Sequence, residues 1–554
     1  MLTRADDRFH ARTPDRALRP IYVDRLPPCN HACPAGENVQ AWLGEAQAGR
    51  FREAWEIIVR DNPLPAVHGR VCYHPCEDAC NRKDVDERVS VHAVERFIGD
   101  MAIEHGWSVR SDPPPSGNRV LIVGAGPSGL SAAWHLARLG HSVAIHDAGP
   151  RVGGMLGFGI PKYRLPREVL DAEVARIAAM GVEILLNHKV TDLVREKAAG
   201  GFDAVFVAVG AHVSKRQDIP ARDAGPIYDA LQFLKDADGG INSARIGRRV
   251  AIYGGGNTAM DAARTARRLG GEPVIIYRRT REQMPAHDFE ADEALEEGVR
   301  IQWLRTIKRF DGTTLTVEVM KLDDKGFPRP TGVVETLDAD SLILALGQDT
   351  DTAFLKAVPG IEFRHDGTVI VGPDMQTGCA GIFAGGDMVP FDRTVTTAVG
   401  HGKKAARNID AWLQTTTYAM APKHAVVTAG MLRPWYHSAT RMRAQSRIEV
   451  DRRNHTFDEV IGGLDSRTAR FEAQRCLSCG NCFECDGCYS ACPERAVIKL
   501  GAGRRYTFDL EKCTGCGICY DQCPCGAIEM VEKEHVSTRN FQFPTPNVQS
   551  PQAV

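Results

Sequence analysis

The chain has 554 residues, a net charge of −2, 25% charged residues and 43% hydrophobic residues. A chain of this length exceeds one hydrophobic core and predicts three or four domains. The balanced charge excludes a strongly basic nucleic-acid-binding surface, and no segment approaches the ~18 consecutive apolar residues typical of a membrane span.

The cysteines indicate metal sites rather than disulfides. Sixteen of the 17 cysteines fall in two dense groups, 29–80 and 476–525. Cysteines spaced two or three residues apart are typical of metal ligands in a reducing compartment. Because residues 1–16 also lack the apolar core of a secretory signal, we expect a cytoplasmic protein.

The predicted elements alternate between strands and helices along the middle of the chain. Residues 1–115 hold five cysteines and short amphipathic helices, and 112–118 (DPPPSGN) form a linker. Two strand–glycine turn–helix–strand units follow, one from residue 119 and one from residue 248. Further strands are predicted at 202–210, 341–347 and 381–387, a helix at 403–413, and a cysteine-rich module at about 471–535. This alternation predicts an α/β fold with two Rossmann-like nucleotide-binding domains.

The first glycine turn predicts a dinucleotide site. Gly124-x-Gly126-x-x-Gly129 follows a strand and opens a helix, where glycines permit the tight turn and let the backbone approach a pyrophosphate. The helix N-terminus attracts the phosphate charge. Asp147 ends the next strand, where an acid binds the ribose hydroxyls. A nucleotide-free turn is the weaker alternative.

The second glycine turn predicts a different nucleotide preference. It reads Gly254-x-Gly256-x-x-Ala259, and the position equivalent to Asp147 is Tyr277, followed by Arg278 and Arg279. Arginine at this place pairs with a 2′-phosphate, so the second site favours NADPH over NADH. The alternative is that both arginines are solvated charges at a strand end.

Two dinucleotide sites in one chain imply hydride transfer between a diffusing nicotinamide and a bound flavin. The motifs GAGPSGL, HDAGPRVGGMLGFGIPKYRLP, GGGNTAMD, YRR and TGCAGIFAGGD, in this order over about residues 28 to 412, resemble the small (β) chain of glutamate synthase. The flavin–NADPH half of dihydropyrimidine dehydrogenase is similar.

The resemblance implies FAD on the first unit and a fold of the glutathione-reductase type. It implies FAD contacts from Gly124, Gly126, Pro127, Ser128, Gly129, Asp147, Gly154, Met155, Arg164, Val190, Gly386, Asp387 and Thr397. It implies NADP contacts from Gly254, Gly256, Asn257, Thr258, Ala259, Arg278, Arg279 and Gly347. Hydride transfer to a flavin requires no general acid or base, so no catalytic side chain is nominated. His287, Asp288 and Glu290 are interpreted as a solvated helix start.

The C-terminal cysteines predict a ferredoxin module with two 4Fe–4S clusters. Two Cys-x2-Cys-x2-Cys-x3-Cys-Pro runs occur, and in such runs the fourth cysteine binds the other cluster. One cluster is therefore assigned Cys482, Cys485, Cys488 and Cys523, and its partner Cys513, Cys516, Cys519 and Cys492. Zinc is a remote alternative. Cys525 and Cys379 receive no ligand role, although Cys525 is a candidate for tuning the neighbouring cluster.

The N-terminal cysteines are one pair short of the family pattern. The relatives' RCxxCG motif ahead of Cys29 is missing, which leaves five thiols for two clusters. By resemblance, Cys33, Cys72 and Cys76 match one cluster whose fourth ligand is an oxygen donor, here Glu95. The alternative for Glu95 is an ordinary helix-surface carboxylate. Cys29 and Cys80 remain.

The surplus pair Cys476 and Cys479, in RCLSCG, has the form of the missing motif. We therefore expect a composite cluster bound by Cys29, Cys80, Cys476 and Cys479, formed within one chain or between two. The alternatives are that the cluster is absent, that CLSC binds something else, or that these thiols are free and buried.

These assignments predict the following division: 1–115 helical iron–sulfur domain, 116–245 and 350–420 FAD-binding domain, 246–349 NAD(P)H-binding domain, 421–470 linker, 471–535 α+β ferredoxin domain and 536–554 tail. The predicted function is an FAD and iron–sulfur oxidoreductase subunit that passes electrons between NADPH (or NADH) and a partner chain in a hetero-oligomer. By similarity to known flavoprotein subunits, the expected partner is a 2-oxoacid:ferredoxin oxidoreductase or a glutamate synthase large chain. Alternatives are a free-standing NADPH:ferredoxin reductase, a bifurcating transhydrogenase, or a non-catalytic electron-transfer adapter.

Overall fold

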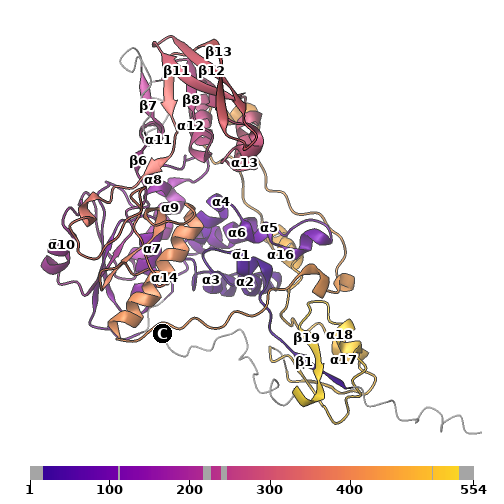
Figure 1. The fold of residues 1–554 in the computed structure, drawn as a ribbon. Helices are drawn as coiled ribbons and strands as arrows, with labels where there is room; N and C mark the ends of the chain where they lie inside the picture. The colour runs from indigo at the N-terminus through magenta and orange to yellow at the C-terminus, as the bar shows by residue number, and fades with distance from the viewer. Residues whose placement is uncertain (1–16, 110–112, 216–225, 239–245, 502, 536–554) are drawn as a thin grey trace, which may run out of the picture.

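The computed structural model describes residues 17–109, 113–215, 226–238, 246–501 and 503–535. The expectations for 1–16 and for the tail at 536–554 lie outside these ranges. In Figure 1, two nucleotide-binding domains and a ferredoxin module surround a central group of N-terminal helices.

The N-terminal helices form a small bundle around buried tryptophans. They are α1 (Pro28–Ala32), α2 (Val39–Gln47), α3 (Phe51–Ile58), α4 (Pro65–Val71), α5 (Pro75–Asp78) and α6 (Val91–Glu104). The Asn38 side chain accepts a hydrogen bond from the Ala41 amide and so caps α2. Trp42 and Trp55 are completely buried. The helices are short and the cysteines lie at their ends, so packing of the apolar faces places the thiols.

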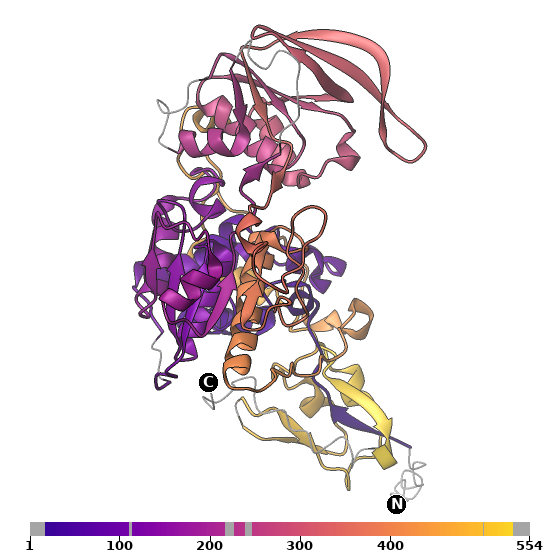
Figure 2. The same cartoon turned by 60° about the vertical axis from the view of Figure 1, so that its left-hand side comes forward.

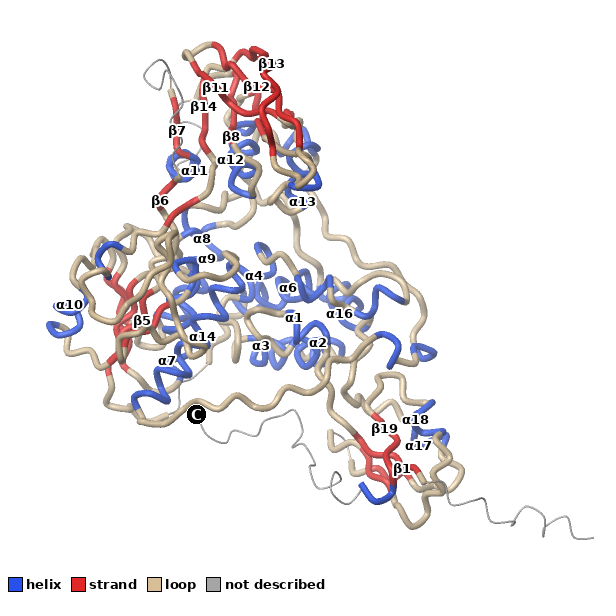
Figure 3. The backbone as a smooth tube through the Cα atoms, in the orientation of Figure 1, coloured by secondary structure: helices blue, strands red, loops and turns tan. Residues whose placement is uncertain are grey.

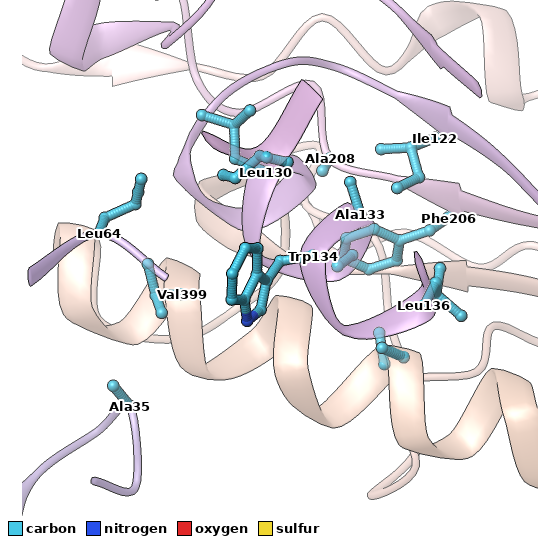
Figure 4. Packing of buried hydrophobic residues seen from close by; sticks show 14 of the residues in the cluster. Ala35, Leu64, Ile122, Leu130, Ala133, Trp134, Leu136, Phe206, Ala208 and Val399 are labelled. Carbon is cyan, nitrogen blue, oxygen red and sulfur yellow. The ribbon is translucent and has the colours of Figure 1, made fainter. Parts of the chain in front are cut away.

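The first nucleotide domain is a parallel sheet with the order β16-β5-β2-β3-β4. Its strands are β2 (Arg119–Val123), β3 (Ser142–His146), β4 (Glu183–Leu185), β5 (Ala204–Val207) and β16 (Ile382–Ala384). Helices α7 (Pro127–Arg138) and α14 (Val395–Leu413) pack together beside the sheet, as Figure 4 shows around Trp134. Trp134 is fully buried and its indole N–H donates to the Val59 carbonyl at 2.8 Å, which ties this domain to the bundle.

The second nucleotide domain repeats this plan with the parallel order β10-β9-β8-β14-β7. The strands are β7 (Ile227–Asp229), β8 (Arg249–Tyr253), β9 (Glu272–Tyr277), β10 (Arg300–Trp303) and β14 (Ser341–Leu344), with helices α11 (Ala230–Ala237), α12 (Asn257–Arg268) and α13 (Asp288–Glu296). An antiparallel sheet of β11 (Arg305–Phe310), β12 (Thr314–Leu322) and β13 (Pro328–Asp338) covers it. The fold class therefore agrees with the sequence prediction, but β7 and α11 belong to the second nucleotide domain although the sequence analysis placed residues 116–245 in the FAD-binding domain.

The ferredoxin module contains a strand from the far end of the chain. Its own elements are α17 (Gly487–Ala491), β17 (Val497–Lys499), β18 (Tyr506–Phe508), α18 (Ile518–Asp521) and β19 (Ile528–Glu532). β1 (Leu18–Tyr22) pairs antiparallel with β19, in the register Tyr22 to Ile528. Figures 1 and 2 show this indigo strand beside the yellow module. The sequence analysis did not predict this pairing.

The segment between α14 and the ferredoxin module touches several parts of the molecule. Its backbone pairs with the N-terminal region at Leu26 and Val426, and Arg453 forms a 3.2 Å ion pair with Glu296 of the second nucleotide domain. Figure 3 shows it as mostly irregular chain, with the short helix α15 (Val450–Arg453) and then α16 (Ser466–Gln474). Minor elements elsewhere are α8 (Met155–Phe158), α9 (Arg167–Ala178), α10 (Leu193–Ala199) and the pair β6 (Val213–Ser214) with β15 (Gln348–Asp349). Within the described ranges, no helix combines the length and apolarity that crossing a bilayer requires.

Candidate functional site

A single large cavity, of about 1540 Å³, extends between the two nucleotide domains and reaches both glycine turns. Eighteen of the predicted nucleotide-binding residues line it: Gly124, Gly126, Pro127, Ser128, Asp147, Gly154, Met155, Arg164, Val190, Gly386, Asp387, Gly254, Gly256, Asn257, Thr258, Arg278, Arg279 and Gly347. The other three predicted residues, Gly129, Ala259 and Thr397, are not among the lining residues. The cavity is therefore continuous from one predicted nucleotide-binding site to the other.

The first glycine turn fits a dinucleotide. A Cβ on Gly129 would lie 1.9 Å from the Gly124 carbonyl oxygen, so only glycine permits this packing, whereas Gly126 faces open space. The buried Ser128 hydroxyl has no hydrogen-bond partner among the described residues and is available to a phosphate. The Asp147 carboxylate accepts hydrogen bonds from the Ala125 and Gly149 amides, both at 2.6 Å, which fixes it at the turn.

The flavin half of the cavity ends against α14. Gly386 has φ +73°, and its amide donates to His401 Nδ1 at 3.2 Å. Burial raises the pKa of Asp387 to about 6. Thr397, at the start of α14, bonds through its amide to Thr394 Oγ1 and serves the helix cap. These contacts fix the backbone that the resemblance places around FAD.

The second glycine turn also leaves room for a dinucleotide. A Cβ on Gly254 would lie 2.2 Å from the Ala345 carbonyl oxygen, whereas Gly256 faces open space. Arg278 is exposed, and the buried Arg279 Nε has no hydrogen-bond partner among the described residues. Two guanidinium groups at this edge of the cavity suit a 2′-phosphate, which carries two or more acceptor oxygens.

The interpretation of His287, Asp288 and Glu290 as a solvated helix start was wrong for Glu290 alone, because His287 and Asp288 are exposed at the start of α13. Glu290 is completely buried and forms an ion pair with Arg164 of the first nucleotide domain, whose guanidinium also bonds Asp261 at 2.8 Å. The His287 ring stacks on Tyr73 of the N-terminal bundle, with ring centroids 3.7 Å apart. Glu290 is buried because an arginine of another domain packs against it, which the local polar pattern cannot reveal.

Tyr73 was missed by the sequence analysis. Its hydroxyl accepts a hydrogen bond from Asn257 Nδ2 at 2.7 Å, while Asn257 Oδ1 accepts from the His287 amide at 3.0 Å. Asn257 opens the helix of the second glycine turn. A residue adjacent to Cys72 therefore holds the turn that is predicted to bind NADP.

The predicted cluster ligands form four groups in the structure, and the members of each group lie close to one another. We name the groups as follows. The proximal set is Cys33, Cys72, Cys76 and Glu95. The bridging set is Cys29, Cys80, Cys476 and Cys479. The inner ferredoxin set is Cys482, Cys485, Cys488 and Cys523, and the outer ferredoxin set is Cys492, Cys513, Cys516 and Cys519.

The proximal set lies directly behind the cavity wall. Val71 lines the cavity, and the next residue, Cys72, accepts a hydrogen bond from the Thr396 hydroxyl of α14 at 3.1 Å. Burial raises the pKa of Cys72 to about 12; the Thr396 hydrogen bond opposes this rise, and nearby Glu95 adds to it. Glu95 is only 6% exposed, so the alternative of a helix-surface carboxylate is wrong.

Glu95 is a buried carboxyl group whose ionised form would be stabilised by a nearby positive charge. Its Oε1 accepts a hydrogen bond from Asn62 at 2.9 Å, and Asn62 also donates to Glu37. Burial raises the pKa of Glu95 well above its usual value, and the neighbouring carboxylates of Glu37 and Glu173 raise it further. A bound iron cluster would supply the positive charge that stabilises these acids and the thiolates beside them.

The bridging set joins residues up to 450 positions apart. Burial raises the pKa of Cys29 well above its usual value, and Cys476, Cys80 and Cys479 raise it further because their negative charges would repel a thiolate. Four half-buried thiols that oppose one another's ionisation fit a cationic metal centre. The chain brings the two halves together within itself, through contacts such as that of Asn81 Nδ2 with Cys479 Sγ at 3.6 Å.

The two ferredoxin sets are brought together crosswise as the cysteine runs predict. Cys523, from the second run, lies among Cys482, Cys485 and Cys488, and its negative charge raises the pKa of each. All four members of the outer set line one small cavity: Cys492, Cys513, Cys516 and Cys519. A hydrogen bond from Cys525 lowers the pKa of Cys523 below its usual value.

Comparisons with known proteins agree with this arrangement. Residues 117–406 match the family model of pyridine nucleotide-disulphide oxidoreductases. Residues 12–107 match domain II of dihydropyrimidine dehydrogenase, a 4Fe–4S cluster domain, and residues 506–529 match a 4Fe–4S binding domain.

Three relatives resemble most of the chain. The NADP(+)-dependent formate dehydrogenase subunit beta of Moorella thermoacetica is 36% identical, over 82% of this chain and 70% of the relative. The NADPH-Fe(3+) oxidoreductase subunit beta of Geobacter sulfurreducens is 34% identical, over 83% and 76%. The glutamate synthase [NADPH] small chain of Escherichia coli is 36% identical, over 70% and 89%.

The family model covers more than half of the chain, and both glycine turns line the large cavity. The chain therefore belongs to the pyridine nucleotide-disulphide oxidoreductase family, as an FAD- and NAD(P)H-dependent oxidoreductase with 4Fe–4S domains before and after its nucleotide-binding core.

Proposed function

We propose that this chain is the electron-transfer subunit of a larger enzyme and connects NADP(H) to a partner chain through FAD and four 4Fe–4S clusters. The observation that carries the proposal is the unbroken succession of the four ligand sets from the cavity wall to the ferredoxin module. FAD, when bound, supplies the conversion between a two-electron hydride and single electrons.

Each ligand set has a short connection to the next. The proximal and bridging sets share α1, because Cys29 lies in it and Cys33 follows its last residue. The bridging and inner sets are joined where Cys479 precedes Cys482 by three residues, and the Gly480 amide donates to the Cys525 carbonyl at 2.6 Å. The inner and outer sets share α17, which holds Cys488 and is followed directly by Cys492. These connections support an electron path in the order proximal, bridging, inner, outer.

The nucleotide preference is proposed to be NADPH. Arg278 and Arg279 border the cavity at the end of β9, where an unphosphorylated ribose would leave both guanidinium groups without a ligand. Asp147 occupies the equivalent place in the first domain and suits the ribose of FAD. The chain itself would bind and orient the nucleotides, and no side chain of the cavity is required to move a proton.

The partner is proposed to carry the substrate chemistry. Candidates are a 2-oxoacid:ferredoxin oxidoreductase or a glutamate synthase large chain, and the names of the relatives add formate dehydrogenase and Fe(3+) reduction as further classes of reaction. The dense clustering of the cysteines favours a reducing compartment, and we infer a cytoplasmic location.

The test is an anaerobic titration of the purified full chain with NADPH and, separately, with NADH. We expect loss of the flavin absorbance with NADPH at lower concentration than with NADH, followed by electron paramagnetic resonance (EPR) signals of reduced clusters. Absence of bleaching with either nucleotide would refute the proposal and favour an electron-transfer adapter. Flavin bleaching without reduced clusters would refute the electron path.

Purification of the tagged chain from its native host tests the subunit role. A catalytic chain recovered in equal amount, whose reaction depends on NADP(H), is the expected result. If the chain is recovered alone and reduces free ferredoxin at full rate, the free-standing reductase is correct instead.

A further inference from the structure

The strand β1 places the side chain of Tyr22 beside the inner ferredoxin set. Tyr22 is the last residue of β1, which pairs with β19. Its ring stacks on Phe508, with centroids 4.8 Å apart, in the core of the ferredoxin module. Figures 1 and 2 both show β1 against β19, so this position belongs to the fold of the module.

The Tyr22 hydroxyl lies 3.1 Å from Cys488 Sγ. A cysteine that binds iron is a thiolate and has no proton to donate, so the tyrosine O–H is the donor. Two residues separated by 466 positions thus form one O–H···S hydrogen bond at a predicted cluster ligand.

A second side chain approaches the same ligand set. Cys525 Sγ lies 3.8 Å from Cys523 Sγ, and both residues are buried. By the same argument, Cys525 keeps its proton and donates to the Cys523 thiolate. The Ala527 amide also donates to Cys523 Sγ, at 3.3 Å.

Hydrogen bonds to cluster ligands stabilise negative charge. A reduced cluster carries one more negative charge than the oxidised cluster, so a donor stabilises the reduced state more and raises the reduction potential. Burial strengthens the effect because solvent does not screen the donor.

We propose that Tyr22 and Cys525 are positioning residues that raise the reduction potential of the inner ferredoxin cluster through hydrogen bonds to Cys488 and Cys523. This inference rests on the proposed function, because it takes the inner set as ligands of one cluster. The inner cluster adjoins the bridging set, so a raised potential would favour electron transfer from the flavoprotein into the module.

The experiment is a redox titration of the full chain, purified anaerobically, with cluster reduction followed by EPR. The variants are Tyr22→Phe, which keeps the ring and its stacking, Cys525→Ala, and the double variant. Tyr506→Phe is the matched control, because its hydroxyl lies in the same module but donates to Asp486 at 2.5 Å.

We expect each single variant to lower the reduced-to-oxidised ratio of one cluster about tenfold at fixed potential, which is ~59 mV for a one-electron couple. Both changes should fall on the same one-electron step and add in the double variant. The control should leave every step unchanged, and iron content should stay equal in all variants.

Three results would overturn the proposal. Unchanged potentials with full iron content in Tyr22→Phe and Cys525→Ala would exclude tuning. Loss of iron in Tyr22→Phe would assign the residue a structural role. An equal shift in Tyr506→Phe would show that the effect is not specific to the sulfur hydrogen bond.

The proposed function fails in a distinguishable way. If the unaltered chain lacks ferredoxin-type clusters, the electron path itself is wrong. Tyr22→Phe and Cys525→Ala could instead shift the reduction potentials of two different one-electron steps. In that case Cys488 and Cys523 bind different clusters, and the inner ligand set is wrong although both hydrogen bonds still act.

Discussion

The bridging cluster is tested by replacing the ligands that come from the C-terminal side. In the variant Cys476→Ser with Cys479→Ser, two of its four proposed ligands lose their thiolates. A 4Fe–4S cluster normally requires four protein ligands, so we expect this cluster to be lost completely. The unaltered chain should contain about sixteen iron atoms and the variant about twelve, with acid-labile sulfide falling in parallel.

The structure predicts that the rest of the protein survives this change. The segment around Cys476 is also held by Arg475, which is only 3% exposed and donates to the Arg88 carbonyl at 2.9 Å and to Asp86 at 3.2 Å. These bonds do not depend on iron. FAD content and bleaching by NADPH should therefore stay normal, while reduction of the ferredoxin clusters by NADPH slows because the connection between them and the flavin is missing.

The assay combines iron, sulfide and FAD per chain with stopped-flow reduction by NADPH. The matched control is Cys379→Ser, because Cys379 belongs to none of the four ligand sets and should leave all counts unchanged. About twelve iron atoms in the unaltered chain, or an unchanged count in the double variant, would refute the bridging cluster. Loss of eight or more iron atoms together with FAD would show collapse of the fold.

Three further predictions concern single residues. Arg279→Ala should raise KM for NADPH about tenfold and leave that for NADH unchanged, since a charged hydrogen bond contributes ~1.5–3 kcal/mol; equal effects on both nucleotides would contradict a 2′-phosphate contact. Tyr73→Phe should weaken NADP+ binding about fivefold, measured by the flavin difference spectrum, because the ~1 kcal/mol hydrogen bond to the second glycine turn is lost; unchanged affinity would assign Tyr73 to domain docking alone. At Glu297, burial opposes ionisation, but hydrogen bonds from Arg268 and Arg264 outweigh it and lower the pKa to about 2 from 4.5. Its stabilisation of the fold, ~3 kcal/mol, should be full above pH 4.5 and be lost as the pH falls toward 2, so the difference in unfolding free energy between the unaltered chain and Glu297→Gln should shrink over this range.

Local sequence patterns were sufficient for the nucleotide-binding core. A strand, a glycine turn and a helix occupy consecutive residues, so Gly124 and Gly254 identify their units without knowledge of the rest of the chain. The cysteine runs are equally local, and their crosswise pairing follows from cluster geometry. These are features in which the residues that interact are also neighbours in sequence.

Contacts between distant segments were not predictable in the same way. The five residues LRPIY of β1 contain a proline and show no distinct strand pattern, yet they pair with β19 more than 500 positions away. Glu290 reads as a helix-start acid, and only the docking of Arg164 from another domain buries it. Neither Tyr22 nor Tyr73 belongs to a motif, so their hydrogen bonds become visible only when the domains are assembled.

The N-terminal region and the ferredoxin module meet at two places. One is the pairing of β1 with β19, and the other is the bridging set of Cys29, Cys80, Cys476 and Cys479. β1 ends at Tyr22, seven residues before Cys29, and Cys479 lies three residues before Cys482. The strand pairing therefore holds one side of the module, and the proposed bridging cluster would hold the other, with little free chain between them. Because the rate of electron transfer depends on distance, a module fixed at both sides keeps its inner cluster at one separation from the bridging cluster. A ferredoxin module on a free linker would instead sample many separations, so the double attachment favours a permanent electron path over a mobile carrier.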